Sequence, residues 1–209
     1  MSQILLLVFE LIGTVAFALS GAMIGLKKKM DIFGVAVLGL ITAVGGGVIR
    51  DIVLGNTPPE TFKNPVYGLV ALATSLFVFI PVFRKLHSLK QHIFDVVLLI
   101  MDSLGLAVFT VMGINTAVSV TGKFNVYLLL FVGIITGTGG GVIRDILAKD
   151  TPYIFIKHFY ATASLIGAGV CILLWNFVSH MTSMVIGAAV IFVLRMFAAR
   201  YHWKLPKVG

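Results

Sequence analysis

The chain has 209 residues, of which 59% are hydrophobic and only 11% are charged, and its formal net charge is +8. A soluble globular protein cannot hide that much apolar surface, so the composition excludes one and indicates an integral membrane protein. The positive charges occur in short clusters between apolar segments, which argues against a nucleic-acid partner and makes them topology signals in a lipid bilayer.

Apolar stretches long enough to cross a bilayer recur along the whole chain. A hydrocarbon core of about 30 Å needs about 20 residues in helix. We therefore expect an all-α membrane protein with seven transmembrane helices, at about residues 4–26, 31–53, 65–86, 93–116, 125–147, 158–177 and 179–199. No Pro-rich or Ser-rich linker separates them, so residues 1–209 are expected to form a single membrane domain.

The first stretch is followed, not preceded, by positive charges, which favours a retained helix over a cleaved signal. Lys27, Lys28 and Lys29 are predicted to share one side of the membrane with Arg84, Lys85, Lys90, Lys149, Lys157, Arg200, Lys204 and Lys207. The opposite side has little beyond Lys63 and Lys123. The bias predicts a cell (inner) membrane protein with its N-terminus outside and its C-terminus in the cytoplasm. An aromatic belt is expected at Tyr67, Tyr127, Tyr153, Tyr160, Trp175 and Trp203.

The second and fifth stretches contain an internal repeat. Residues 45–52 read Gly-Gly-Gly-Val-Ile-Arg-Asp-Ile, and residues 139–146 repeat this octapeptide identically. In the preceding helices Glu10 corresponds to Asp102. The chain is thus predicted to hold two three-helix repeats, at about 2–86 and 92–177, with the helix at about 179–199 outside them. An odd number of crossings per repeat makes the second copy inverted, an architecture typical of transport proteins.

The two glycine triplets are the first candidate pore elements. Three consecutive glycines weaken a helix, so a kink or a short unwound stretch is expected, with free carbonyls that could replace part of a cation's hydration shell. Close helix packing is the alternative explanation. The residues are Gly45, Gly46, Gly47, Gly139, Gly140 and Gly141.

Charged residues within the spans are the second candidate set: Arg50, Asp51, Arg144, Asp145, Glu10 and Asp102. A charge in the membrane is costly, so such residues usually face a cavity or a partner. Neighbours on a helix point about 100° apart, so we do not expect short contacts between Arg50 and Asp51. We hypothesise pairs of Glu10 with Arg50 and of Asp102 with Arg144, either as gate bridges or as purely structural ones.

Hydroxyl groups are the third set, at Ser20, Thr42, Thr136 and Thr138. They could contact a partly dehydrated ion or bond back to their own helix. Cys171 is the only cysteine, and no nucleophile–base pattern or metal-ligand cluster is recognisable. We therefore expect no enzyme activity, no cofactor and no structural metal.

The repeated Gly-Gly-Gly-Val-Ile-Arg-Asp motif resembles that of prokaryotic members of the trimeric intracellular cation channel (TRIC) family. The resemblance covers the whole chain and implies a homotrimer whose protomers each hold a pore. It implies that helices one, two, four and five line this pore, with two and five bent at the glycines, and that transient K⁺ or Na⁺ passes through. The animal members carry Lys-Glu-Val where this chain has Arg50 and Asp51, so their lipid regulation is not carried over.

A transporter is the alternative interpretation, because the same bacterial domain is also linked to glycine uptake. A transporter of glycine or another small amino acid would use the same broken helices to bind its substrate at mid-membrane and alternate its exposure. The sequence leaves the channel and the transporter both open.

Overall fold

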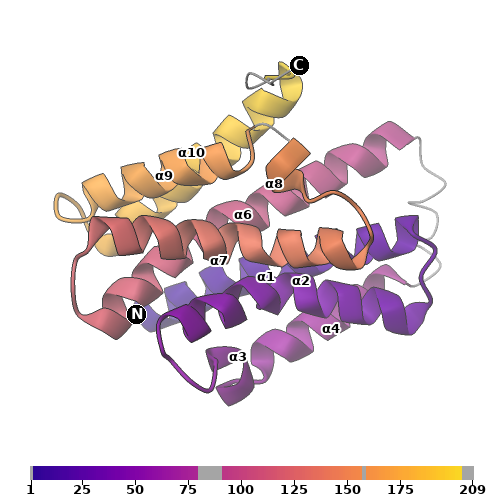
Figure 1. Cartoon of the computed structure of the whole chain (residues 1–209), viewed down its shortest axis with the longest axis horizontal. Coiled ribbons are helices and arrows are strands. Elements are labelled where there is room, and N and C mark those ends of the chain that lie inside the picture. The colour runs from indigo at the N-terminus through magenta and orange to yellow at the C-terminus, as the bar shows by residue number, and fades with distance from the viewer. Residues whose placement is uncertain (1, 80–90, 157–158, 204–209) are drawn as a thin grey trace.

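The computed structural model describes residues 2–79, 91–156 and 159–203, and within these ranges the fold is entirely helical. The long helices run side by side as a bundle (Figure 1). Five of them are long and apolar enough to cross a membrane, which confirms an all-α membrane protein. These are α1 (Ser2–Lys27), α2 (Ile32–Val53), α6 (Gln91–Thr121), α7 (Val126–Leu147) and α10 (His180–Arg200).

Two shorter apolar helices stand where longer spans were predicted. They are α4 (Val66–Val78) and α9 (Ala161–Leu174), with 13 and 14 residues. At a rise of 1.5 Å per residue the longer of them measures only about 21 Å. Residues 80–86 of the predicted third span, like Arg84, Lys85, Lys90, Lys157, Lys204 and Lys207, lie outside the described residues. Two single-turn helices, α3 (Glu60–Lys63) and α8 (Tyr153–Ile156), follow α2 and α7.

Local signals explain where the long helices begin and end. The side chain of Asp31 caps α2 by accepting from Gly34 N at 2.7 Å, and Asn125 caps α7 by accepting from Leu128 N at 3.2 Å. α6 runs to Thr121, past the predicted end at about 116, because neither glycine nor proline occurs between residue 116 and Gly122. That glycine has φ +60°, a conformation that stops a helix.

The helix pairs α1–α2 and α6–α7 pack in corresponding ways. A Cβ atom added to Gly21 of α1 would lie 2.8 Å from the Cα of Gly39 in α2, and one added to Gly113 of α6 would lie 2.9 Å from the carbonyl of Val132 in α7. Backbones so close tolerate no side chain between them. The first two helices of each copy therefore meet through the same glycine position.

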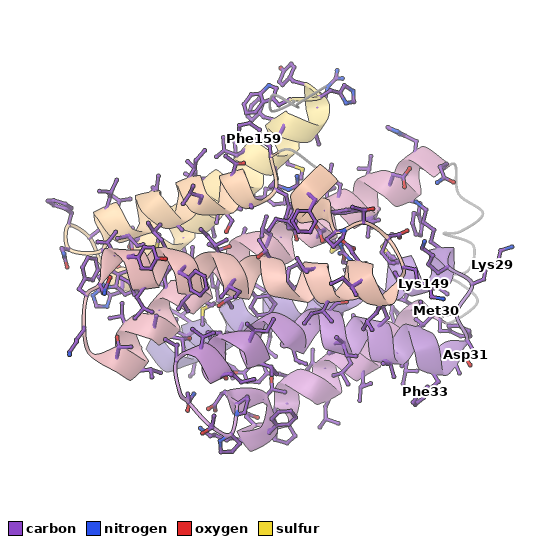
Figure 2. The ribbon with its side chains drawn as sticks, in the orientation of Figure 1. Lys29, Met30, Asp31, Phe33, Lys149 and Phe159 are labelled. Atoms are coloured by element: carbon purple, nitrogen blue, oxygen red, sulfur yellow. The ribbon has the colours of Figure 1, made fainter. Side chains whose placement is uncertain are left out.

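One end of the bundle brings lysine-bearing turns together. Figure 2 shows Lys29, Met30 and Asp31 of the α1–α2 turn near Lys149, which follows α7. Lys28 Nζ contacts Asp150 Oδ1 at 2.5 Å, which links the two turns. At the same end Lys27 Nζ lies 3.7 Å from Asp95 Oδ1 near the start of α6. The positive charges of both copies are thus concentrated on this side.

Candidate functional site

The glycine triplets remain α-helical. Residues 45–47 and 139–141 lie within the continuous helices α2 and α7, so the predicted unwound stretch is wrong, whereas a bend stays a prediction. A Cβ atom on Gly46 would lie 2.2 Å from the carbonyl oxygen of Thr136, and one on Gly140 would lie 2.1 Å from that of Thr42. The opposing backbone thus covers each glycine and protects the local hydrogen bonds that side chains would otherwise shield.

These two contacts define an antiparallel crossing of α2 and α7. Gly46 faces Thr136 and Gly140 faces Thr42, so the chain runs along α2 in the direction opposite to that in α7. The hydroxyls of Thr42 and Thr136 donate to the carbonyls of Leu38 and Val132, each at 2.6 Å. Thr138 bonds back to its own helix in the same way, at 2.8 Å from Ile134 O. Each hydroxyl keeps its lone pairs for a further contact.

Each arginine of the repeat binds the aspartate that follows it. Arg50 Nε donates to Asp51 Oδ1 at 2.8 Å, and Arg144 Nε donates to Asp145 Oδ1 at 2.8 Å. We predicted no short contact between Arg50 and Asp51, and this was wrong because the long arginine side chain reaches around the helix to its neighbour. The other carboxylate oxygen of each aspartate accepts a backbone N–H, from Glu60 at 2.8 Å and from Tyr153 at 2.9 Å. The carboxylates therefore anchor α3 and α8 to the ends of α2 and α7.

The Asp102 cluster comprises Asp102, Arg144, Asp145, Tyr160 and Arg195. Arg144 Nη1 donates to Asp102 Oδ1 at 2.6 Å, as predicted, and both side chains are fully buried. The same nitrogen donates to the hydroxyl of Ser20 in α1. Arg195 Nη2 lies 3.9 Å from Asp102 Oδ2, so two arginines share one carboxylate. Removal of either charge sign would leave the opposite charge buried.

The Glu10 cluster comprises Glu10, Arg50, Asp51, Glu60 and Tyr67. The hydroxyl of Tyr67 donates to Glu10 Oε2, and Arg50 is paired with Asp51. The predicted Glu10–Arg50 ion pair is therefore not formed, although both side chains line one pocket of about 30 Å³ together with Glu60 and Tyr67. Tyr67 takes the position on Glu10 that the prediction had assigned to arginine.

The two clusters lie at different depths of the bundle. Glu10 belongs to the first cluster, whereas Ser20, ten residues further along α1, contacts the second. Ten residues correspond to about 15 Å of helix. A cavity of about 310 Å³ adjoins the Asp102 cluster, lined by Lys27, Asp95, Leu98, Leu99, Asp102, Tyr153 and Arg195. It shares no lining residue with the pocket at Glu10.

Aromatic side chains fill the space between the clusters. The buried ring of Phe17 lies 5.4 Å from that of Phe109, measured between centroids. A Cβ atom on Gly105 would lie 2.0 Å from the Phe17 ring, so any larger residue at position 105 would collide with this ring. The structure thus has two pockets with charged residues in their lining, and the Phe17–Phe109 ring pair lies between Glu10 and Asp102 along α1 and α6.

The sequence analysis misplaced two aromatic residues and overlooked one arginine. Tyr160 and Trp175 were expected in an interfacial belt, but both are buried. Arg195 was overlooked as a candidate, and it is only 3% exposed. The signal was available, because an arginine inside an apolar span is a candidate functional residue by position alone.

Comparisons with known proteins agree with the fold and the repeat. The family model described as "Glycine transporter" matches residues 7–82 and 99–176, close to the two copies recognised in the sequence. The UPF0126 inner membrane protein YadS of Escherichia coli K12 is 39% identical over 199 residues, which cover 94% of this chain and 93% of YadS.

Solved channel structures superpose on the whole chain. A prokaryotic TRIC channel determined in 0.5 M KCl matches with a TM-score of 0.87 at 33% identity, covering 97% of this chain and 100% of that one. The TRIC orthologue of Rhodobacter sphaeroides matches with a TM-score of 0.86 at 31% identity, covering 95% and 99%. Similarity at this level extends to the arrangement of all the long helices.

Proposed function

The chain belongs to the prokaryotic TRIC family, and on this basis we propose that it is a channel that passes K⁺ and Na⁺ through a path inside each protomer. The observation that carries the proposal is the pair of charge-lined pockets at two depths of one bundle, at Glu10 and at Asp102. Intramembrane charges that line cavities are typical of ion pathways.

In the proposed topology α4 and α9 complete two inverted three-helix repeats, and α10 is the seventh crossing. The lysine-bearing end with Lys27, Lys29 and Lys149 faces the cytoplasm, following the positive-inside rule. The Asp102 cluster then lies toward the cytoplasm and the Glu10 cluster toward the outside, with the N-terminus outside. Three protomers form the working assembly, which light scattering of the purified protein in detergent would test.

The proposed path follows α1, α2, α6 and α7. It enters at the Glu10 pocket, passes the Phe17–Phe109 contact beside the glycine crossing, and leaves through the cavity at Asp102. An apolar constriction of this kind gates ions by excluding water. In the proposed closed state the rings of Phe17 and Phe109 form this constriction, and conduction requires them to separate.

Reconstitution into a planar bilayer with asymmetric KCl tests the proposal directly. We expect unitary currents that reverse near the K⁺ equilibrium potential and that persist when Na⁺ replaces K⁺. Liposomes without protein are the control for leak. Saturable glycine uptake by proteoliposomes, in the absence of such currents, would instead identify a transporter and overturn the proposal.

Neutralising Glu60 should lower the cation current at low salt. Glu60 lines the Glu10 pocket, and only its backbone N–H is used to hold Asp51, so Glu60→Gln keeps that bond. We expect single-channel K⁺ conductance to fall about twofold at 50 mM KCl and to be unchanged at 1 M, where the charge is screened.

Asp31→Asn is the matched control for Glu60→Gln. Asp31 lines neither pocket, and asparagine caps a helix as well as aspartate does, as Asn125 shows at the start of α7. Its conductance should equal that of the unmodified protein at both salt concentrations. Equal loss in both variants would mean that Glu60 has no special place at the mouth.

A further inference from the structure

Helix α10, which lies outside the two repeats, contributes a buried arginine, Arg195, to the Asp102 cluster and none to the Glu10 cluster. Arg195 of α10 contacts three groups from other elements. Nη2 lies 3.9 Å from Asp102 Oδ2, Nη1 donates to Phe159 O at 3.5 Å, and the guanidinium lies 4.8 Å from the centroid of the Tyr160 ring. Figure 2 shows Phe159 near the end of α10.

Arg195 makes the two ends of the proposed path electrostatically different. The Glu10 cluster combines one arginine with three carboxylates, whereas the Asp102 cluster combines two arginines with two carboxylates. The first end therefore attracts cations and the second does not. Without Arg195 the Asp102 cluster would have one arginine and two carboxylates, and both clusters would hold more carboxylates than arginines.

Tyr160 occupies a space that is open at the other end. A Cβ atom on Gly141 would lie 2.8 Å from Tyr160 Oη, whereas one on the repeat-related Gly47 would meet only Arg50 Nη2, at 3.9 Å. The Gly47 position lines the pocket at Glu10. The tyrosine, held under the guanidinium of Arg195, thus fills the corresponding space beside Arg144.

This filled end is also poorly satisfied in hydrogen bonding. Among the described residues, the buried atoms without a hydrogen-bond partner include Tyr160 Oη and Arg195 Nε, while Asp102 Oδ2 and Arg195 Nη2 have only the 3.9 Å ion pair between them. An unmet polar atom in the interior is costly, and water would relieve that cost. Water that enters the cluster from the adjoining cavity would therefore find polar atoms to bind.

We propose that Arg195 is a gate residue that, with Tyr160, closes the Asp102 end of the permeation path. The inference rests on the proposed channel function and goes beyond it by assigning a role to α10, which the repeat leaves out. Arg195 lines the cavity itself, and its stacking on Tyr160 holds that ring over Gly141. Opening moves the ring away and admits water to the cluster.

Arg195→Gln is the test, and Arg200→Gln is its matched control. Both remove one positive charge from α10, but Arg200 is exposed in the last turn. We expect Arg195→Gln to raise open probability about tenfold, the effect of losing a desolvated cation–π contact together with the bridge to Asp102. The ratio of currents at opposite voltages should also move toward one, because both clusters then hold more carboxylates than arginines. Arg200→Gln should match the unmodified channel in both measurements.

Two further variants keep the proposal testable if Arg195→Gln folds poorly. Arg195→Lys retains the charge and should preserve rectification while opening more often, because an ammonium cannot stack as a planar group does. Tyr160→Ala should raise open probability alone, without a change in rectification. Monodisperse elution and a cooperative melting transition establish folding.

The outcomes separate this inference from the channel proposal. If the unmodified protein and Arg200→Gln conduct K⁺ and Arg195→Gln shows the same open probability and rectification, Arg195 is no gate and the channel proposal stands. If the unmodified protein conducts no ions, the channel proposal fails and the inference fails with it.

Discussion

Replacing Gly46 by alanine is expected to destabilise the protein by about 3 kcal/mol, although alanine is the better helix former. The added methyl group would lie 2.2 Å from the carbonyl oxygen of Thr136, a backbone atom that cannot move without separating α2 from α7. Gly140→Ala should have the same effect, because its Cβ would lie 2.1 Å from Thr42 O. Unfolding in mixed detergent–SDS micelles measures the loss.

Gly47→Ala is the control for this prediction, since it lies one residue away in the same helix. Its nearest contact would be Arg50 Nη2, at an ordinary 3.9 Å, so the change should be neutral or should stabilise by up to about 1 kcal/mol. If Gly46→Ala and Gly47→Ala proved equally stable, the close crossing of α2 and α7 would be wrong.

Asp102→Asn should cost about 3–5 kcal/mol, because it leaves the guanidinium groups of Arg144 and Arg195 buried without their shared carboxylate. The neutral amide keeps the size of the side chain, so the loss reports charge rather than packing. We expect the variant to unfold at a markedly lower SDS fraction than the unmodified protein.

Asp95→Asn provides the comparison on the same helix. Asp95 is half exposed and lies 3.7 Å from Lys27, a pair of the surface kind that contributes about 0–1 kcal/mol. The two aspartates line one cavity, so the difference between the variants isolates the effect of burial. Similar small losses for both would show that the Asp102 bridges do not hold the bundle.

Sequence patterns predicted the parts of the fold that depend on hydropathy and repetition. The identical octapeptides led to the paired helices α2 and α7. The end of α6 was predicted about five residues too early, because neither glycine nor proline stops the helix between residue 116 and Gly122. The Asp102–Arg144 bridge was also predictable, because corresponding charges in two copies must find partners in the membrane.

The remaining contacts depend on side-chain reach and on which helices approach each other. The prediction that neighbouring residues point about 100° apart took no account of the length of the arginine side chain, so the Arg50–Asp51 hydrogen bond was missed. The Glu10–Arg50 pair failed because Tyr67, brought in by α4, reaches Glu10. Hydropathy could not reveal the packing of Tyr160 against Arg195, since these residues come from elements far apart in the chain.

The contact between α2 and α7 has a mechanical consequence, that of a pair of scissors. Gly46 and Gly140 each stand fifteenth in a 22-residue helix, so a short arm of one helix lies beside a long arm of the other on both sides of the pivot. If the crossing angle between α2 and α7 widens about this fixed point, the helix ends on both sides of the crossing move apart together. At a lever length of about 10 Å, roughly seven residues, a rotation of about 10° displaces an arm by nearly 2 Å. Scissor motion would widen both mouths at once, as a channel requires.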